Sequence, residues 1–138
     1  MILNDKQMHV SRTALAKLEA ALDIIRSQSD SLEWVRQIEM DALESQIEDI
    51  RADMTRYEKL RAGQVEFLES CPLEELPTRL IEIRIASHLT QTELAGRLGL
   101  KPQQIQRYEA SRYSGVSLAR LTSAVKALLH DKEVPIRL

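Results

Sequence analysis

The sequence predicts an all-α protein in two parts, a long helical hairpin followed by a compact domain of four short helices. Aromatic residues make up only 4% of the chain. Apolar residues recur at steps of three and four over most of its length, which is the period of an amphipathic helix. Glycines follow two of these periodic segments, where helices commonly end. At 138 residues the chain can hold two small domains.

The first expected helix starts near Ser11, a residue type that caps helices. It ends in residues 27–31, a run of turn formers. Its apolar residues are Leu15, Leu18, Leu22 and Ile25. A second helix is expected over residues 32–62, with apolar residues at heptad a and d positions. These heptad residues are Met40, Leu43, Ile47, Ile50, Met54 and Tyr57. The two helices should pack as an antiparallel, coiled-coil-like hairpin.

The two expected helices differ in length, about 16 against about 31 residues, or roughly 24 Å against 46 Å. About half of the heptad seam would then have no partner within the hairpin. An exposed apolar stripe of that length usually marks an interface, so the six heptad residues are predicted to form a dimer seam. In the alternative, the stripe packs on the chain's own C-terminal domain.

The expected domain boundaries follow from glycine and proline. Residues 1–62 form the hairpin, for dimerisation or partner binding, and Gly63 ends its second helix. Residues 63–77 are a linker in which two prolines interrupt any helix. Residues 78–130 form the compact domain, with Thr78 as its first cap, and residues 131–138 are a tail, either a short strand or loose.

The two halves of the chain carry opposite charge. Residues 1–77 contain 9 Lys or Arg and 16 Asp or Glu, a net charge of −7, while residues 78–138 contain 10 and 5, a net charge of +5. A basic C-terminal half suits contacts with phosphates. The acidic half should project away from nucleic acid, where it can pair with itself or with a basic protein. Alternatively, its charges form a solvated helical face.

Residues 89–109 have the spacing of two short helices joined by a tight turn. Leu94 and Leu98 form an apolar stripe, and Gly99 permits a positive φ. Pro102 suits the first position of the next helix, where its missing N–H costs nothing. The polar side chains left on the outer surface are Gln103, Gln104, Gln106 and Arg107. Gln and Arg are the residue types that read adenine and guanine edges.

This segment resembles the helix-turn-helix domain of the Cro/C1 (XRE) family, and the resemblance extends over residues 80–128, about a third of the chain. It implies a four-helix, lambda-repressor-like DNA-binding domain. The base-reading residues that it implies are Gln103, Gln104 and Arg107. The implied contacts with the DNA backbone are Gln91, Lys101, Arg112 and Tyr113. The chain departs from the family pattern at Lys101 and Pro102, which removes one expected base contact.

Two further features follow from the resemblance. Arg84 and Glu109 match a structural salt bridge that joins the first helix of the domain to the third. His88 stands where relatives usually carry glycine, and is expected to be a turn residue with positive φ. Several relatives dimerise through a fifth helix, which has no counterpart after the helix that Ser117 should cap. The hairpin is therefore expected to supply the dimer contact.

No pattern indicates an enzyme, a cofactor or a metal. His9, His88, His130 and Cys71 lie too far apart for a metal-ligand motif, and the four glycines form no phosphate-binding loop. A single cysteine excludes an intramolecular disulfide and fits a reducing compartment. No segment matches a membrane span or signal peptide, so we expect a cytoplasmic protein.

Three functional hypotheses remain. The first is a dimeric transcriptional repressor of a palindromic operator, bound to double-stranded DNA with half-sites about 34 Å apart. The second is an antitoxin whose acidic part masks a basic protein toxin while the C-terminal domain represses the shared operon. The third is an architectural or assembly protein with no sequence preference.

Overall fold

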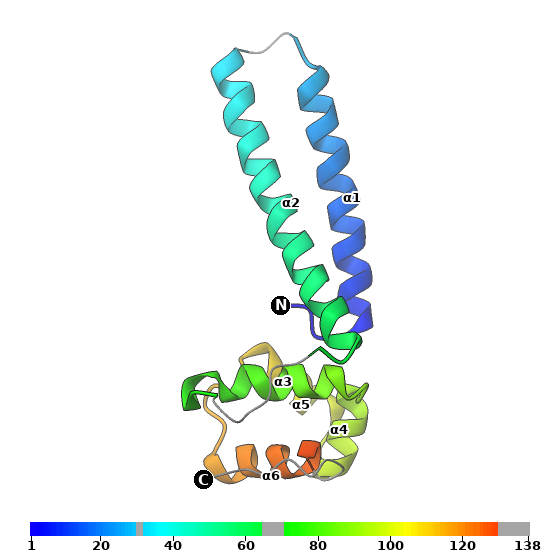
Figure 1. Cartoon of the computed structure of the whole chain (residues 1–138), viewed down its shortest axis with the longest axis vertical. Coiled ribbons are helices and arrows are strands. Elements are labelled where there is room, and N and C mark those ends of the chain that lie inside the picture. The colour runs from blue at the N-terminus through cyan, green and yellow to red at the C-terminus, as the bar shows by residue number, and fades with distance from the viewer. Residues whose placement is uncertain (30–31, 65–70, 130–138) are drawn as a thin grey trace. The chain divides into compact units, whose positions relative to one another are not determined.

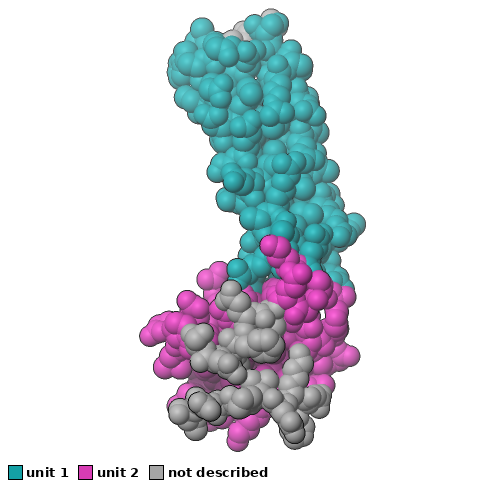
Figure 2. Space-filling model, in the orientation of Figure 1, with its two compact units in different colours: residues 1–58 teal, residues 59–138 magenta. Residues whose placement is uncertain are grey.

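The structure, a computed structural model, describes residues 1–29, 32–64 and 71–129 (Figure 1). All regular secondary structure within these residues is helical, which confirms the all-α prediction. The chain divides into two compact units, residues 1–58 and 59–138, which are described separately (Figure 2). The prediction for the tail at residues 131–138 lies outside the described residues.

The first unit contains α1 (Asp5–Ser27) and all but the last three residues of α2 (Glu33–Arg61), which run antiparallel as a hairpin (Figure 1). The prediction that α1 starts near Ser11 is wrong. Asn4 caps the helix, because its side-chain oxygen accepts a hydrogen bond from the Gln7 N–H at 2.9 Å. At 23 and 29 residues the helices are about 35 Å and 44 Å long, so their lengths differ much less than expected.

The heptad residues of α2 lie inside the hairpin. Ile47 and Tyr57 are buried, and the remaining four are half-buried. At the far end of α2, the Tyr57 hydroxyl donates to Asp5 Oδ1 at 2.7 Å, and the Met1 amino group pairs with Asp53 at 2.9 Å. The start of the chain thus covers the part of α2 that was expected to lack a partner. The prediction of a half-exposed dimer seam fails because α1 begins earlier than expected.

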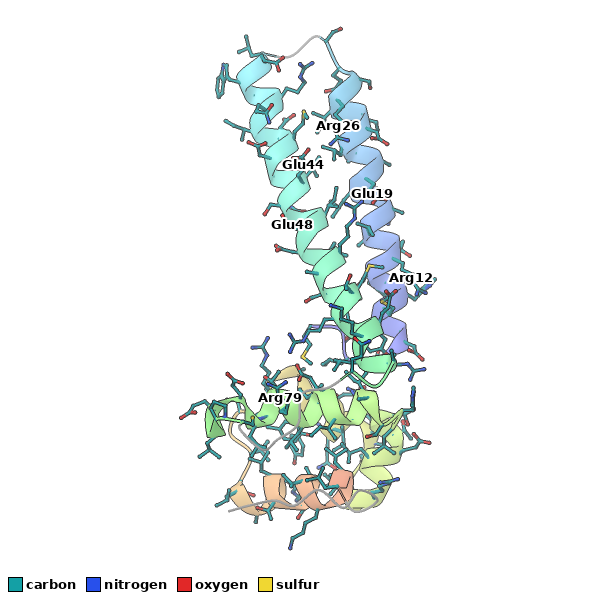
Figure 3. All side chains as sticks on the ribbon, in the orientation of Figure 1. Arg12, Glu19, Arg26, Glu44, Glu48 and Arg79 are labelled. Carbon is teal, nitrogen blue, oxygen red and sulfur yellow. The ribbon has the colours of Figure 1, made fainter. Side chains whose placement is uncertain are left out.

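A ladder of ion pairs on the surface of the hairpin matches its register (Figure 3). It consists of Arg26–Glu44 at 2.9 Å, Glu19–Arg51 at 2.5 Å and Arg12–Glu58 at 3.9 Å. Its members recur every seven residues on each helix, and their signs alternate. A slip of one heptad would place Arg12 opposite Arg51 and Glu19 opposite Glu44, so like charges would face each other.

The second unit contains a 3-10 turn, η2 (Leu73–Glu75), followed by α3 (Leu76–Ala86), α4 (Gln91–Leu98), α5 (Pro102–Ala110) and α6 (Leu118–Leu129). Its core is a cluster of buried apolar residues from all four helices, namely Leu80, Ile83, Leu94, Ala95, Ile105, Leu128 and Leu129. The predicted Thr78 cap is wrong, because α3 starts at Leu76 without a side-chain cap and accommodates Pro77 in its first turn. α3 therefore begins two residues inside the segment expected to be a linker.

Replacing Ile47 with Asp tests the position of the seam. Ile47 is 4% exposed, so the variant should lower the free energy of unfolding by about 3 kcal/mol or more, at every protein concentration. Circular dichroism melts at two concentrations measure this loss. The control is Ser45→Asp, on the exposed side of the same helix. A variant that keeps full helicity and only dissociates a dimer would contradict the intramolecular seam.

Candidate functional site

The outward face of α5 is presented by a short, well-capped helix pair. The Glu93 N–H donates to Thr90 Oγ1 at 3.1 Å, and the Thr90 N–H donates to Glu93 Oε2 at 2.7 Å. The Thr90 backbone N–H stabilises the charged carboxylate, so the pKa of Glu93 lies below its ordinary value. α4 ends at Gly99, whose φ of +65° confirms the predicted turn, and the Leu100 N–H returns to the Ala95 carbonyl at 2.8 Å.

The start of α5 explains the role of Gln104. Pro102 occupies the first turn, as predicted, and Lys101 is the N-cap residue. Lys has no side-chain acceptor that could cap the helix. Instead, Gln104 Oε1 reaches back and accepts the Lys101 N–H at 3.0 Å. Gln104 is half-buried, and its amide oxygen is committed to the helix start, which leaves its NH₂ group as the part available to a ligand.

Three long polar side chains are exposed on one face of α5. They are Gln103, Gln106 and Arg107, while Ile105 and Glu109 are buried on the opposite face. Residues four apart on a helix project in the same direction, so Gln103 and Arg107 lie side by side and Gln106 adjoins them. The predicted base-reading residues Gln103 and Arg107 are thus brought together. Gln106 shares their face and was not assigned a site by the resemblance.

A cleft next to the end of α5 brings the predicted residue Arg107 together with Arg120, which the site predictions missed. Its lining residues are Arg107, Tyr108, Ser111, Ser114, Gly115, Val116, Ser117 and Arg120. Two guanidinium groups and several hydroxyls, with no carboxylate among them, form a surface suited to an oxyanion. Arg120 lies in the first turn of α6, where its N–H donates to Ser117 Oγ at 3.2 Å. The expected Ser117 cap was the one feature of the sequence that could have placed Arg120 in the first turn of α6.

A buried ion pair joins α3 to α5 and confirms the predicted salt bridge. Arg84 Nε and Nη2 donate to the two carboxylate oxygens of Glu109 at 2.5 and 2.8 Å. Arg84 Nη1 also donates to the Leu89 carbonyl at 2.9 Å. Gln91 Nε2, at the start of α4, donates to Glu109 Oε2 at 2.7 Å. One carboxylate therefore holds three helices of the domain together.

Two of the predicted DNA-backbone residues lie in the interior. Gln91 and Tyr113 are only 7% and 5% exposed, whereas Lys101 and Arg112 are exposed as expected. Gln91 has turned its amide toward Glu109. The ring of Tyr113 lies against that of Tyr108, with 6.0 Å between ring centroids. Burial raises the pKa of the Tyr113 hydroxyl far above its ordinary value, and the nearby Glu109 carboxylate raises it further.

The inward position of Tyr113 follows from an unusual backbone. Arg112 and Tyr113 have consecutive positive φ values of 51° and 57°, which reverse the chain directly after α5. The Tyr113 N–H then donates to the Tyr108 carbonyl at 2.6 Å. Only Arg112 of these two residues is left on the surface beside the exposed face of α5.

The turn between α3 and α4 also has the predicted conformation. His88 has a φ of 56°, which confirms the expectation of a positive φ at this position. The neighbouring Leu89 N–H donates to the Arg84 carbonyl at 3.1 Å. The turn thereby places the Leu89 carbonyl where it accepts a hydrogen bond from the Arg84 side chain.

The described part of the chain contains no group of three His, Cys, Asp or Glu side chains that could hold a metal ion. Of the helices within residues 1–29, 32–64 and 71–129, none is both long and apolar enough to cross a membrane.

Comparison with known proteins places a family in the region of this site. A family model described as helix-turn-helix matches residues 80–128, which cover α4, α5 and most of α3 and α6. Searches of curated proteins and of solved structures gave no match.

Replacing Glu109 with Gln tests the buried ion pair. The amide keeps the shape of the side chain but leaves the Arg84 charge buried without a counter-ion, so the free energy of unfolding should fall by about 3–5 kcal/mol. Urea unfolding measures the change. Glu74→Gln, at an exposed position, should have almost no effect. An unchanged midpoint for Glu109→Gln would show that the pair contributes nothing to stability.

Replacing His88 with Gly tests the positive φ. Glycine adopts this conformation without a steric penalty, so the free energy of unfolding should rise by about 0.5–1 kcal/mol. His88→Val should lower it by about 1–2 kcal/mol, because a β-branched residue is strained there. Thermal melts measure both. The matched control is His9→Gly inside α1, which should destabilise; the same sign at both positions would contradict this backbone assignment.

Proposed function

Because residues 80–128 form a Cro/C1-type helix-turn-helix domain, we propose that the chain is a sequence-specific transcriptional regulator that represses a palindromic operator as a dimer. The observation that carries the proposal is the pair Gln103 and Arg107, exposed one helical turn apart on α5. The opposite face of that helix is held by the buried Glu109 carboxylate. A rigid helix with polar residues on its free face is what readout of base edges requires.

Within this proposal each polar residue has a distinct role. Arg107 and Gln103 enter the major groove, where Arg pairs with guanine and Gln with adenine. The NH₂ group of Gln104 reaches a base or sugar at the edge of the same contact. Lys101 and Arg112, both exposed, contact phosphates and set the register of the protein on the duplex.

The cleft beside α5 adds a further backbone contact to the proposal. Arg107 and Arg120 border it together with Ser114 and Ser117. A DNA phosphate in this cleft would be neutralised by Arg120 while Arg107 extends to the bases. Gln91, in contrast, contributes indirectly, because its amide supports α5 through Glu109.

The dimer belongs to the same proposal. Two copies bound one DNA turn apart would place their recognition helices about 34 Å from each other. We assign DNA binding to residues 78–130 and partner contacts to the hairpin of residues 1–62, whose acidic surface is repelled by phosphates. Since the heptad seam is used within the hairpin, a dimer contact must use a different surface.

Selection of bound DNA from a random pool, followed by affinity measurements at several salt concentrations, tests the proposal. The selected sequence should contain two inverted half-sites. Arg107→Ala should cost about 1–3 kcal/mol and relax the preference at one base pair, whereas Arg120→Ala should weaken all sequences alike and reduce the salt slope by about one. Lys17→Ala in the hairpin removes the same charge and should change neither property.

Different outcomes distinguish the hypotheses. If Arg107→Ala selects the same sequence with the same affinity, α5 is not the recognition helix. Binding without any sequence preference would support the architectural alternative. A small basic protein that copurifies in stoichiometric amount from the native operon would support the antitoxin alternative.

A further inference from the structure

The outer surface of α2, opposite the heptad seam, combines exposed apolar residues with unpaired acids. The residues that define this acidic face of α2 are Trp34, Ile38, Asp41, Glu48 and Asp49. They follow one another at helical spacing, with Ser45 between them. The face lies entirely within the first unit, so its description involves residues 1–58 alone.

Trp34 and Ile38 form the apolar end of the acidic face of α2. They are 65% and 59% exposed, and they lie one helical turn apart. Leu32, just before α2, is 66% exposed as well. Single exposed apolar residues are common, but a clustered tryptophan and isoleucine resemble the anchors around which protein interfaces form.

The acids of this face have no cation partner within the described residues. Glu48 and Asp49 form no ion pair there, and Asp41 accepts only the Gln37 amide at 2.7 Å. The nearby arginines are committed elsewhere, in the pairs Arg26–Glu44, Arg36–Glu33 and Arg51–Glu19. The face therefore carries three uncompensated negative charges next to its apolar end.

A groove extends this surface along the ladder side of the hairpin. Glu48 forms part of one wall and Asp23 part of the other, and the buried side chains of Leu22 and Ile47 lie between the helices. The lining is completed by the paired ladder residues Arg26, Glu44, Glu19 and Arg51. Figure 3 shows Glu48 one turn along α2 from Glu44 of the ladder. The groove therefore continues from Glu48 toward the middle of the hairpin, with acidic and basic side chains along its borders.

The charge of this surface selects its occupant. Nucleic acid and anionic membranes are repelled by it. A second copy packed through the same face would bring six uncompensated negative charges into one interface. We propose that the acidic face of α2 binds a basic, amphipathic segment of another protein. Trp34 and Ile38 contact its apolar residues, and Glu48 and Asp49 pair with its Lys or Arg side chains. This interaction does not depend on the proposed DNA binding.

The test uses the full chain and a fluorescein-labelled Leu/Lys peptide of about 18 residues that forms a cationic amphipathic helix. Anisotropy should show salt-dependent binding, and a Leu/Glu peptide with the same apolar face should not bind. Trp34→Ala should weaken binding by about tenfold or more. E48Q/D49N should weaken it several-fold and flatten the salt dependence. The substituted residues are exposed, and circular dichroism verifies that the variants stay folded.

The matched control is E39Q/E74Q, which removes two negative charges from exposed positions outside the acidic face. It should leave affinity unchanged. If this control weakens binding as much as E48Q/D49N, the attraction is unspecific and the proposal fails. It also fails if both peptides bind equally, or if the chain self-associates through Trp34 so that Trp34→Ala yields monomers. Operator affinity, measured in parallel, should not respond to Trp34→Ala.

Discussion

The helix-turn-helix domain depends on one buried carboxylate. Glu109 is 1% exposed and accepts hydrogen bonds from Arg84 of α3 and Gln91 of α4. Through Arg84 it is also linked to the backbone of the turn before α4. A buried charge must keep its partners, so α5 cannot rotate or slide without losing several hydrogen bonds at once. The direction in which Gln103 and Arg107 project is therefore set from inside the domain.

This arrangement assigns the polar residues of the domain to separate tasks. Gln91 and Gln104 have amide side chains of the kind that can contact DNA, yet both form hydrogen bonds within the domain. Gln91 donates to Glu109, and Gln104 accepts from the Lys101 N–H. The exposed cations form the remaining set, and Arg107 and Arg120 meet at one cleft although they come from different helices. The exposed residues can thus vary while the internal network stays the same.

Local chemistry made part of this structure predictable. Gly99, the Pro102 helix start, the Arg84–Glu109 pair and the turn at His88 depend on residues close in sequence or on a spacing that the family resemblance supplies. The burial of Tyr113 was not predictable, because residue propensities do not indicate two successive non-glycine residues with positive φ. The prediction for the hairpin seam fails because α1, which covers the seam, starts at its Asn4 cap, before the apolar pattern begins.

The ion-pair ladder changes what the connection between α1 and α2 has to do. In many hairpins the length of the turn sets how the two arms align. Here the buried seam and the alternating charges at Arg12, Glu19 and Arg26 favour one alignment along the arms themselves. The connection therefore does not have to set how the two helices align. A change in the length of the connection should leave the pairing of the two helices unchanged.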